Sequence, residues 1–168
     1  MSLADLEPNS LHVVLHVRSH PPKANDFHWG LYLHRDFEAG GTKYHVQGQG
    51  KDKRWLADHG TTRGVFKSFL LIGLCQVARI PSGLMKDVDA MFRTYDHQLN
   101  EMPGLTCRTW VFRVLELLQK PHSGQVLLKC NDLTSLEHEL LSWGNANALA
   151  AAECQQPRPT HRSDLCGL

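Results

Sequence analysis

The apolar residues of this chain change their spacing near Leu84, and this change constrains the fold more than any other feature. Before it, residues 11–18 and 27–34 are rich in alternating, β-branched or aromatic residues, which is typical of strands. After it, apolar residues recur every three or four positions over 84–100 and 107–120, which predicts two amphipathic helices. Strands followed by helices predict an α+β domain, with helices packed on an antiparallel sheet.

Weaker patterns extend this outline. The Gly40-Gly41 pair predicts a hairpin turn, after which residues 43–48 return as a third strand. The apolar run at 65–80 fits a buried strand or a buried helix, and we favour a strand around 68–78. The remaining predictions are a polar loop at 48–60, a short strand at 125–130 and a helix that opens at the capping box Thr134-Ser-Leu-Glu137.

Length and charge narrow the class of protein. A chain of 168 residues suits one domain with its own core. We expect an N-terminal segment at 1–10, a single domain at 11–153 and a flexible tail at 154–168. Lys plus Arg number 18 and Asp plus Glu 17, so the charge balance gives no reason to expect a nucleic-acid partner.

The cysteines and the N-terminus indicate a reducing compartment. The first ten residues lack the basic start and apolar run of a secretory signal. The longest uncharged apolar stretch, between Lys67 and Arg79, is too short to span a bilayer. Five irregularly spaced cysteines, none in a Cys-x-x-Cys pair, favour reduced thiols over disulfides or a cysteine-built zinc site. We therefore predict a cytoplasmic protein without a transmembrane segment.

Histidine is abundant, with eleven residues, and His28 and His45 lie on predicted strands that neighbour each other. Because alternate residues of a strand share a face, His28 lies opposite the aliphatic residues that face the core. Gly30, on the same face as His28, is expected to leave open space there. His45 shares this face if even positions of one strand pair with odd positions of the other. In that register the two imidazoles are close enough to hydrogen-bond.

Cys107 occupies the first turn of a predicted helix, with Thr106 as its N-cap. A helix N-terminus carries partial positive charge and unpaired N–H groups, both of which stabilise a thiolate. The same N–H groups can hold the oxyanion of an acyl-transfer intermediate. A histidine beside this thiol would complete a thiolate–imidazolium pair, and a second polar group would orient that histidine.

Three motifs in this order resemble the permuted papain-like thiol fold, which includes the lecithin:retinol acyltransferase and small phospholipase A/acyltransferase proteins. They are His-Trp-Gly-Leu-Tyr-Leu at 28–33, Tyr-His-Val at 44–46 and Thr-Cys-Arg-Thr-Trp-Val at 106–111. The resemblance covers residues 11–118 and implies Cys107 as nucleophile, His28 as general base and His45 as third member. It implies transfer or hydrolysis of an acyl group from a small molecule or peptide, with no cofactor or metal. The Cys-x-x-Trp-Val form is most similar to a group of fungal proteins with this order of motifs.

Two other function classes stay open at this point. The family has Asn where Thr106 stands, and His-Phe where this chain has Thr109-Trp110, so the fold could serve as a catalytically inactive binding module for a peptide, lipid or protein. A histidine-rich metal protein is the third alternative. His12 and His16 have the spacing of helical zinc ligands, but Val13-Val14 between them favours a strand.

Overall fold

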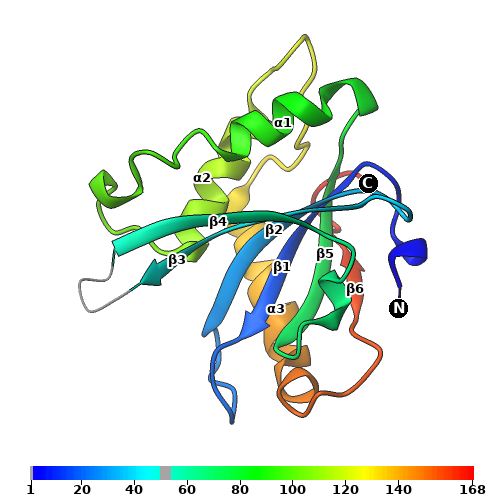
Figure 1. Cartoon of the computed structure of the whole chain (residues 1–168), viewed down its shortest axis with the longest axis vertical. Coiled ribbons are helices and arrows are strands. Elements are labelled where there is room, and N and C mark those ends of the chain that lie inside the picture. Colours follow the sequence, from blue (N-terminus) through cyan, green and yellow to red (C-terminus); the bar gives the residue numbers. More distant parts are fainter. Residues whose placement is uncertain (1, 50–53) are drawn as a thin grey trace.

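The computed structural model describes residues 2–49 and 54–168 (Figure 1). Its centre is a six-stranded sheet in the order β4-β3-β2-β1-β5-β6. The strands are β1 (Ser10–Val17), β2 (Phe27–Asp36), β3 (Gly40–Gln49), β4 (Arg54–Thr62), β5 (Leu71–Arg79) and β6 (Thr160–Arg162). The first five pair antiparallel and β6 pairs parallel to β5, so the sheet is mixed. The prediction of an α+β domain is confirmed, and the prediction of a wholly antiparallel sheet is wrong at β6.

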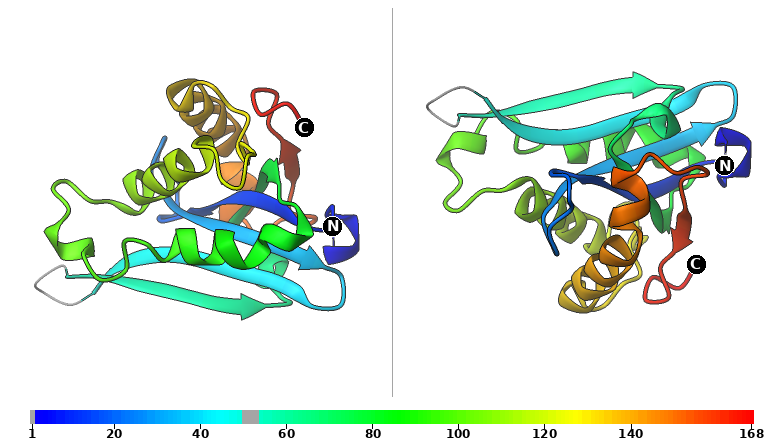
Figure 2. Two further views of the ribbon diagram at one scale, coloured as in Figure 1. Left: turned by 90° about the horizontal axis from the view of Figure 1, so that it is seen from above. Right: turned by 90° about the horizontal axis from the view of Figure 1, so that it is seen from below.

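Three α-helices follow the five long strands in sequence. They are α1 (Met85–Phe92), α2 (Cys107–Gln119) and α3 (Leu133–Ala152). Figure 2 shows α2 and α3 on one side of β1 and β2. The main core forms between them, where Trp29 and Leu31 of β2 pack in one cluster with Trp110 of α2. Alternation along β1 and β2 therefore directs one apolar set toward the helices, as the pattern predicts.

The opposite face of the sheet is covered by two short 3-10 helices, η1 (Leu3–Asp5) and η2 (Val65–Lys67). Leu3 of η1 and Val65 of η2 pack with Val14 of β1 and Leu74 of β5. The first ten residues are thus part of the domain, with Ser10 already in β1. No helix among the described residues is long and apolar enough to cross a membrane.

The helix predicted over 84–100 is shorter, because α1 ends at Phe92. The chain then turns through residues 93–98 to η4 (Leu99–Glu101). Two polar side chains of this region bind β4: Asp96 pairs with His59, and Asn100 bonds to the backbone of Trp55. These long-range bonds need an irregular backbone, and they override the helical spacing of the apolar residues.

The loop predicted at 48–60 contains β4, while residues 50–53 lie outside the described part of the chain. β4 is an edge strand, and most of its side chains are exposed or half-buried. Its polar composition is what an exposed edge requires, but it hides the apolar alternation by which a strand is predicted.

Two predictions about the C-terminal third are also wrong. Residues 125–130 form no strand, only an isolated bridge between His122 and Gln125. The helix predicted to open at a Thr134 capping box begins at Leu133, because the Asp132 carboxylate is the N-cap and accepts from the Thr134 N–H. Asp is preferred over Thr as an N-cap, which explains the earlier start.

The tail predicted to be flexible, 154–168, adds β6 to the sheet. Arg158 is buried, and its guanidinium donates to backbone carbonyls of Phe69 and Ala151. Cys166 is also buried. The polar composition of this segment suggested a mobile tail. In the structure the charged Arg158 side chain instead satisfies buried carbonyl groups, and the segment contains a packed strand.

Candidate active site

A cavity of about 500 Å³ brings the three sequence-predicted site residues together. His28 comes from β2, His45 from β3 and Cys107 from the start of α2. The rest of the lining consists of Arg18, Gln47, Gly48, Trp55 and Thr106. A thiol and two imidazoles from three different elements therefore share one space.

The cavity lies where β2 and β3 part. The two strands pair from Leu31↔Tyr44 to Asp36↔Gly40, and beyond Tyr44 the strand β3 pairs only with β4 (Figure 1). The register joins odd positions of one strand to even positions of the other, which confirms the register needed for His28 and His45 to share a face. His28 Nε2 lies 2.9 Å from His45 Nδ1, a hydrogen bond that links the parted strands.

The space above Gly30 is filled rather than open, contrary to the prediction. A Cβ at this position would lie 3.0 Å from the Tyr44 carbonyl oxygen and 3.2 Å from the His45 Cβ. Glycine is therefore needed because the backbone of β3 approaches closely. The absent side chain lets His45 approach β2 and reach His28.

The local sequence places Cys107 as the first residue of α2. Thr106 has extended backbone angles, and its hydroxyl accepts from the Thr109 N–H at 3.1 Å. The Thr109 hydroxyl in turn accepts from the Thr106 N–H at 2.8 Å, which completes a capping box. The Cys107 side chain is 7% exposed, and within the described chain its sulfur has no hydrogen-bond partner.

Asp58 of β4 lies beside the ring nitrogen of His45 that is turned away from His28. Its Oδ2 lies 3.2 Å from His45 Nε2 and accepts from the Gln47 side-chain amide at 3.0 Å. His45 and Asp58 are direct cross-strand partners, so the ladder itself brings them together. His45 thus has a neighbour at each ring nitrogen: a hydrogen bond to His28 at Nδ1 and the Asp58 carboxylate beside Nε2.

A second histidine–carboxylate pair holds the backbone of His45. His59 lies on the helix-facing side of β4, where its Nδ1 accepts from the His45 N–H at 3.3 Å. Its Nε2 lies 3.1 Å from Asp96 Oδ1, and its ring stacks on Trp110 of α2. This pair joins β3, β4, α2 and the turn after α1 around one residue of the cavity.

The histidines of this face are held neutral near pH 7. Burial, with the nearby charges of Lys43 and Arg18, lowers the pKa of His28 to about 4. Burial, Lys43 and His28 also lower the pKa of His45, although Asp58 opposes them. His16 is the direct partner of His28 on β1, and burial lowers its pKa to about 3. A neutral imidazole can accept a proton, so low pKa values keep these rings in the basic form.

Sequence reasoning missed Asp58, His59 and Asp96. The first two lie on the strand predicted as a loop, and the third lies on the segment predicted as a helix. Asp58 and His59 stand between Ala57 and Gly60, so this stretch lacks the alternation of apolar and polar residues by which a strand is predicted. Pairing β3 with a following strand would have placed an acidic residue opposite His45, but that strand had to be recognised first.

The other histidine pair considered, His12 and His16, lies on β1. His12 Nε2 bonds to the Ser10 hydroxyl at 2.8 Å, and neither histidine belongs to a group of potential metal ligands in the described ranges. One such group occurs elsewhere: Glu139, His161 and Asp164. There Glu139 accepts hydrogen bonds from His161, Ser163 and the Asp164 N–H, which attach β6 to α3.

Fold and cavity together define an α+β domain in which a helix-opening cysteine and a bonded histidine pair line one cavity. The chain belongs to a family of unknown function (DUF6914), which matches residues 9–163. The matched range contains all three helices and the six strands, and thus every residue of the site. Comparison with curated proteins and with solved structures gave no match. Function must therefore be argued from the site.

Proposed function

We propose that this protein is a cysteine-dependent acyl hydrolase or acyltransferase with a permuted papain-like arrangement. Cys107 is the nucleophile, His28 the general base and His45 the third member. The observation that carries the proposal is the shared cavity, which Cys107 enters from a helix start and the bonded His28–His45 pair from parted strands. The order of these elements, two histidine strands before a cysteine helix, is the order that the resemblance implies.

The contacts of the His45 ring support this assignment by favouring one tautomer. The Asp58 carboxylate lies 3.2 Å from His45 Nε2, and its negative charge favours the proton on that nitrogen. Neutral His45 then has a lone pair on Nδ1, which accepts from His28 Nε2–H. Neutral His28 consequently has its lone pair on Nδ1. Asp58 is thus a positioning residue that leaves His28 with one free basic nitrogen for the thiol.

The reaction proceeds in two balanced steps. Nδ1 of His28 takes the Cys107 proton while sulfur attacks the carbonyl carbon of an ester, amide or thioester. The C–S bond forms, the bond to the leaving group breaks, and His28 returns the proton to that group. Water or an acceptor nucleophile then attacks the thioester and His28 takes its proton. The C–S bond breaks, and His28 gives that proton to the Cys107 sulfur, which restores the thiol.

The start of α2 supports the charge that develops on the carbonyl oxygen. The first N–H groups of a helix lack partners within the helix. The Thr106 hydroxyl binds the N–H of Thr109, which leaves the N–H groups of Cys107 and Arg108 for an oxyanion. These donors are fixed before the reaction, so they need no reorganisation in the transition state.

A specific observation favours a second candidate function, a catalytically inactive binding module. The Cys107 sulfur packs in the main core and makes no hydrogen bond to either imidazole among the described residues. In the catalytic function this hydrogen bond would have to form when substrate binds, as catalytic hydrogen bonds often do. In the binding module, the cavity holds a peptide, lipid or protein segment without reacting with it.

Residue-resolved alkylation separates the two functions. The protein is treated with iodoacetamide at several pH values, and each cysteine is quantified by mass spectrometry. Cys154 is exposed and serves as the internal reference, whereas Cys107 is 7% exposed. An unactivated buried thiol must react more slowly than an exposed one. We expect Cys107 to react faster than Cys154 in wild type, and to lose that advantage in His28→Gln.

The control variant is His138→Gln, which removes an exposed imidazole of α3 and should react like wild type. Hydrolysis of p-nitrophenyl esters, absent in Cys107→Ser, would then establish acyl transfer. If Cys107 reacts more slowly than Cys154 at every pH, the catalytic proposal fails and the binding module stands.

A further inference from the structure

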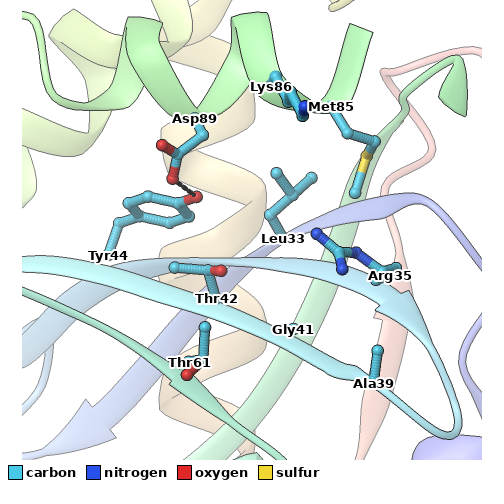
Figure 3. A pocket seen from close by; sticks show the side chains of 10 residues that line it. All are labelled: Leu33, Arg35, Ala39, Gly41, Thr42, Tyr44, Thr61, Met85, Lys86 and Asp89. Carbon is cyan, nitrogen blue, oxygen red and sulfur yellow. Dashed lines mark hydrogen bonds between the residues drawn. The ribbon is translucent and has the colours of Figure 1, made fainter. Parts of the chain in front are cut away.

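A second cavity, of about 430 Å³, lies on the helix-bearing side of the sheet, between α1 and the β2–β3 hairpin (Figure 3). Its floor is a row of directly paired residues across three strands: Leu33 of β2, Thr42 of β3 and Thr61 of β4. Met85 and Lys86 of α1 form the opposite wall. The volume lies in the range of cavities that hold small molecules.

Two cations from opposite walls face this cavity. Arg35 lies two residues after Leu33 on β2. Figure 3 shows its guanidinium turned toward the space between Leu33 and Met85. Lys86 comes from the first turn of α1. Within residues 2–49 and 54–168, neither side chain has an ion pair or a hydrogen bond. Both charges are therefore available to a ligand.

The single carboxylate that lines the cavity is already neutralised. Asp89 accepts two hydrogen bonds from the Arg93 guanidinium, at 3.0 and 3.1 Å, and a third from the Tyr44 hydroxyl. These bonds hold the pKa of Asp89 below its usual value although burial opposes them, so the carboxylate is ionised and balanced by Arg93. The remaining charge of the lining, from Arg35 and Lys86, is positive.

The cavity is also lined by apolar side chains. Leu33 and Tyr44 are almost fully buried within the core, and Met85 packs against that core from α1. Met85 is only half-buried, so its side chain supplies the apolar surface that stays in water and that an apolar group of a ligand would cover. Cations at the mouth and apolar side chains below match a molecule with one anionic end.

We propose that this cavity binds a small organic anion, a carboxylate or phosphate monoester joined to an apolar group. The anionic head lies between Arg35 and Lys86, and the apolar group lies against the half-buried side chain of Met85. Arg35 forms paired hydrogen bonds to the head, since a guanidinium matches two oxygens of a carboxylate or phosphate. The site is separate from the Cys107 cavity and does not depend on catalysis there.

Backbone-amide NMR on the full chain tests this site with hexyl phosphate, hexanoate and neutral hexanol as probes. We expect saturable shifts at Gly41, Thr42, Thr61 and Lys86 with at least one anionic probe. Tighter binding of hexyl phosphate assigns a phosphate head, and tighter binding of hexanoate a carboxylate. Arg35→Gln and Lys86→Gln should each weaken that binding at least tenfold, because each removes one charged contact.

Lys67→Gln is the matched control, because it removes an exposed cation of η2 that lies outside this cavity. It should bind the probes as wild type does. Equal affinity for hexanol would overturn the anionic assignment. Absence of saturable shifts at the four amides, or wild-type affinity in both Arg35→Gln and Lys86→Gln, would overturn the site itself.

Discussion

The Asp58 carboxylate lies 3.2 Å from the outer ring nitrogen of His45, on an edge strand where its own side chain is 55% exposed. An exposed residue thus lies at the outer end of a partly buried, hydrogen-bonded histidine pair, His28–His45. Exposure means that water screens the Asp58 charge, so its electrostatic contribution to stability is small. Its role is to favour the proton on the outer nitrogen of His45, which sets the tautomers of the pair.

Asp58→Asn tests whether the carboxylate selects the tautomer of His45. An amide can donate through nitrogen as well as accept through oxygen, so His45 is free to adopt either tautomer, and His28 follows it. We expect mixed tautomers at His28 in imidazole ¹⁵N spectra. We also expect about a tenfold slower alkylation of Cys107, the factor that a shift of one pKa unit represents. Asp87→Asn is the control, because Asp87 pairs with His122 in a similar way but away from the cavity. It should leave the His28 tautomer and the Cys107 alkylation rate unchanged. A single unchanged His28 tautomer in Asp58→Asn would contradict this role.

The pH profile of Cys107 follows from the pKa of His28. Burial, Lys43 and Arg18 lower that pKa to about 4, so His28 keeps its basic lone pair down to about pH 4. General-base activation should persist between pH 6.5 and about 4 and fall below that window. The measurement is the Cys107 alkylation rate relative to Cys154 from pH 8 to 3. An acid limb near pH 6.5, the pKa of an unperturbed imidazole, would show that burial does not tune His28.

Gly30→Val tests the close approach of β2 and β3. Its Cβ alone would lie 3.0 Å from the Tyr44 carbonyl oxygen and 3.2 Å from the His45 Cβ, so β3 must move outward. We expect loss of the His28–His45 hydrogen bond, slower Cys107 alkylation and a destabilisation of about 1–3 kcal/mol from overpacking. Gly60→Ala is the control, since a Cβ there meets nothing within 4 Å. Wild-type alkylation and ring tautomers in Gly30→Val would show that the approach is not required.

The same residues show how far sequence could predict this site. The place of Cys107 followed from the Thr106 cap, because a cap is local. Alternation placed His28 on one face of its strand but left the β2–β3 register open, and the structure supplies it. Asp58 and His59 could not be placed, because an edge strand needs no apolar alternation. β2 and β3 part beside the start of α2, and Trp110 of this helix stacks on His59 of β4. Such contacts are long-range, and no local pattern records them.

Glu139→Gln tests what attaches the C-terminal strand. Burial raises the pKa of Glu139, but hydrogen bonds from Ser163, the Asp164 N–H and His161 lower it further, leaving it below its usual value. An amide keeps the shape but loses the charge, and we expect a destabilisation of about 1–3 kcal/mol. Buried Cys166 should then become open to alkylation. Glu116→Gln, an exposed change on α2, should leave Cys166 protected. Equal protection in both variants would show that packing alone holds the strand.

Stability should fall in mild acid because of histidines that are buried in the neutral form. Burial lowers the pKa of both His12 and His16 to about 3, whereas an unfolded chain has histidines near 6.5. Below pH 6.5 the unfolded state therefore binds protons that the folded state does not, and each histidine removes about 1.4 kcal/mol per pH unit until about pH 3. Urea unfolding at pH 7.5, 6 and 5 measures this slope. His12→Gln should lower this slope by the contribution of one proton. His138→Gln, at an exposed position, should leave the slope unchanged. Constant stability of wild type from pH 7.5 to 5 would contradict neutral burial of these rings.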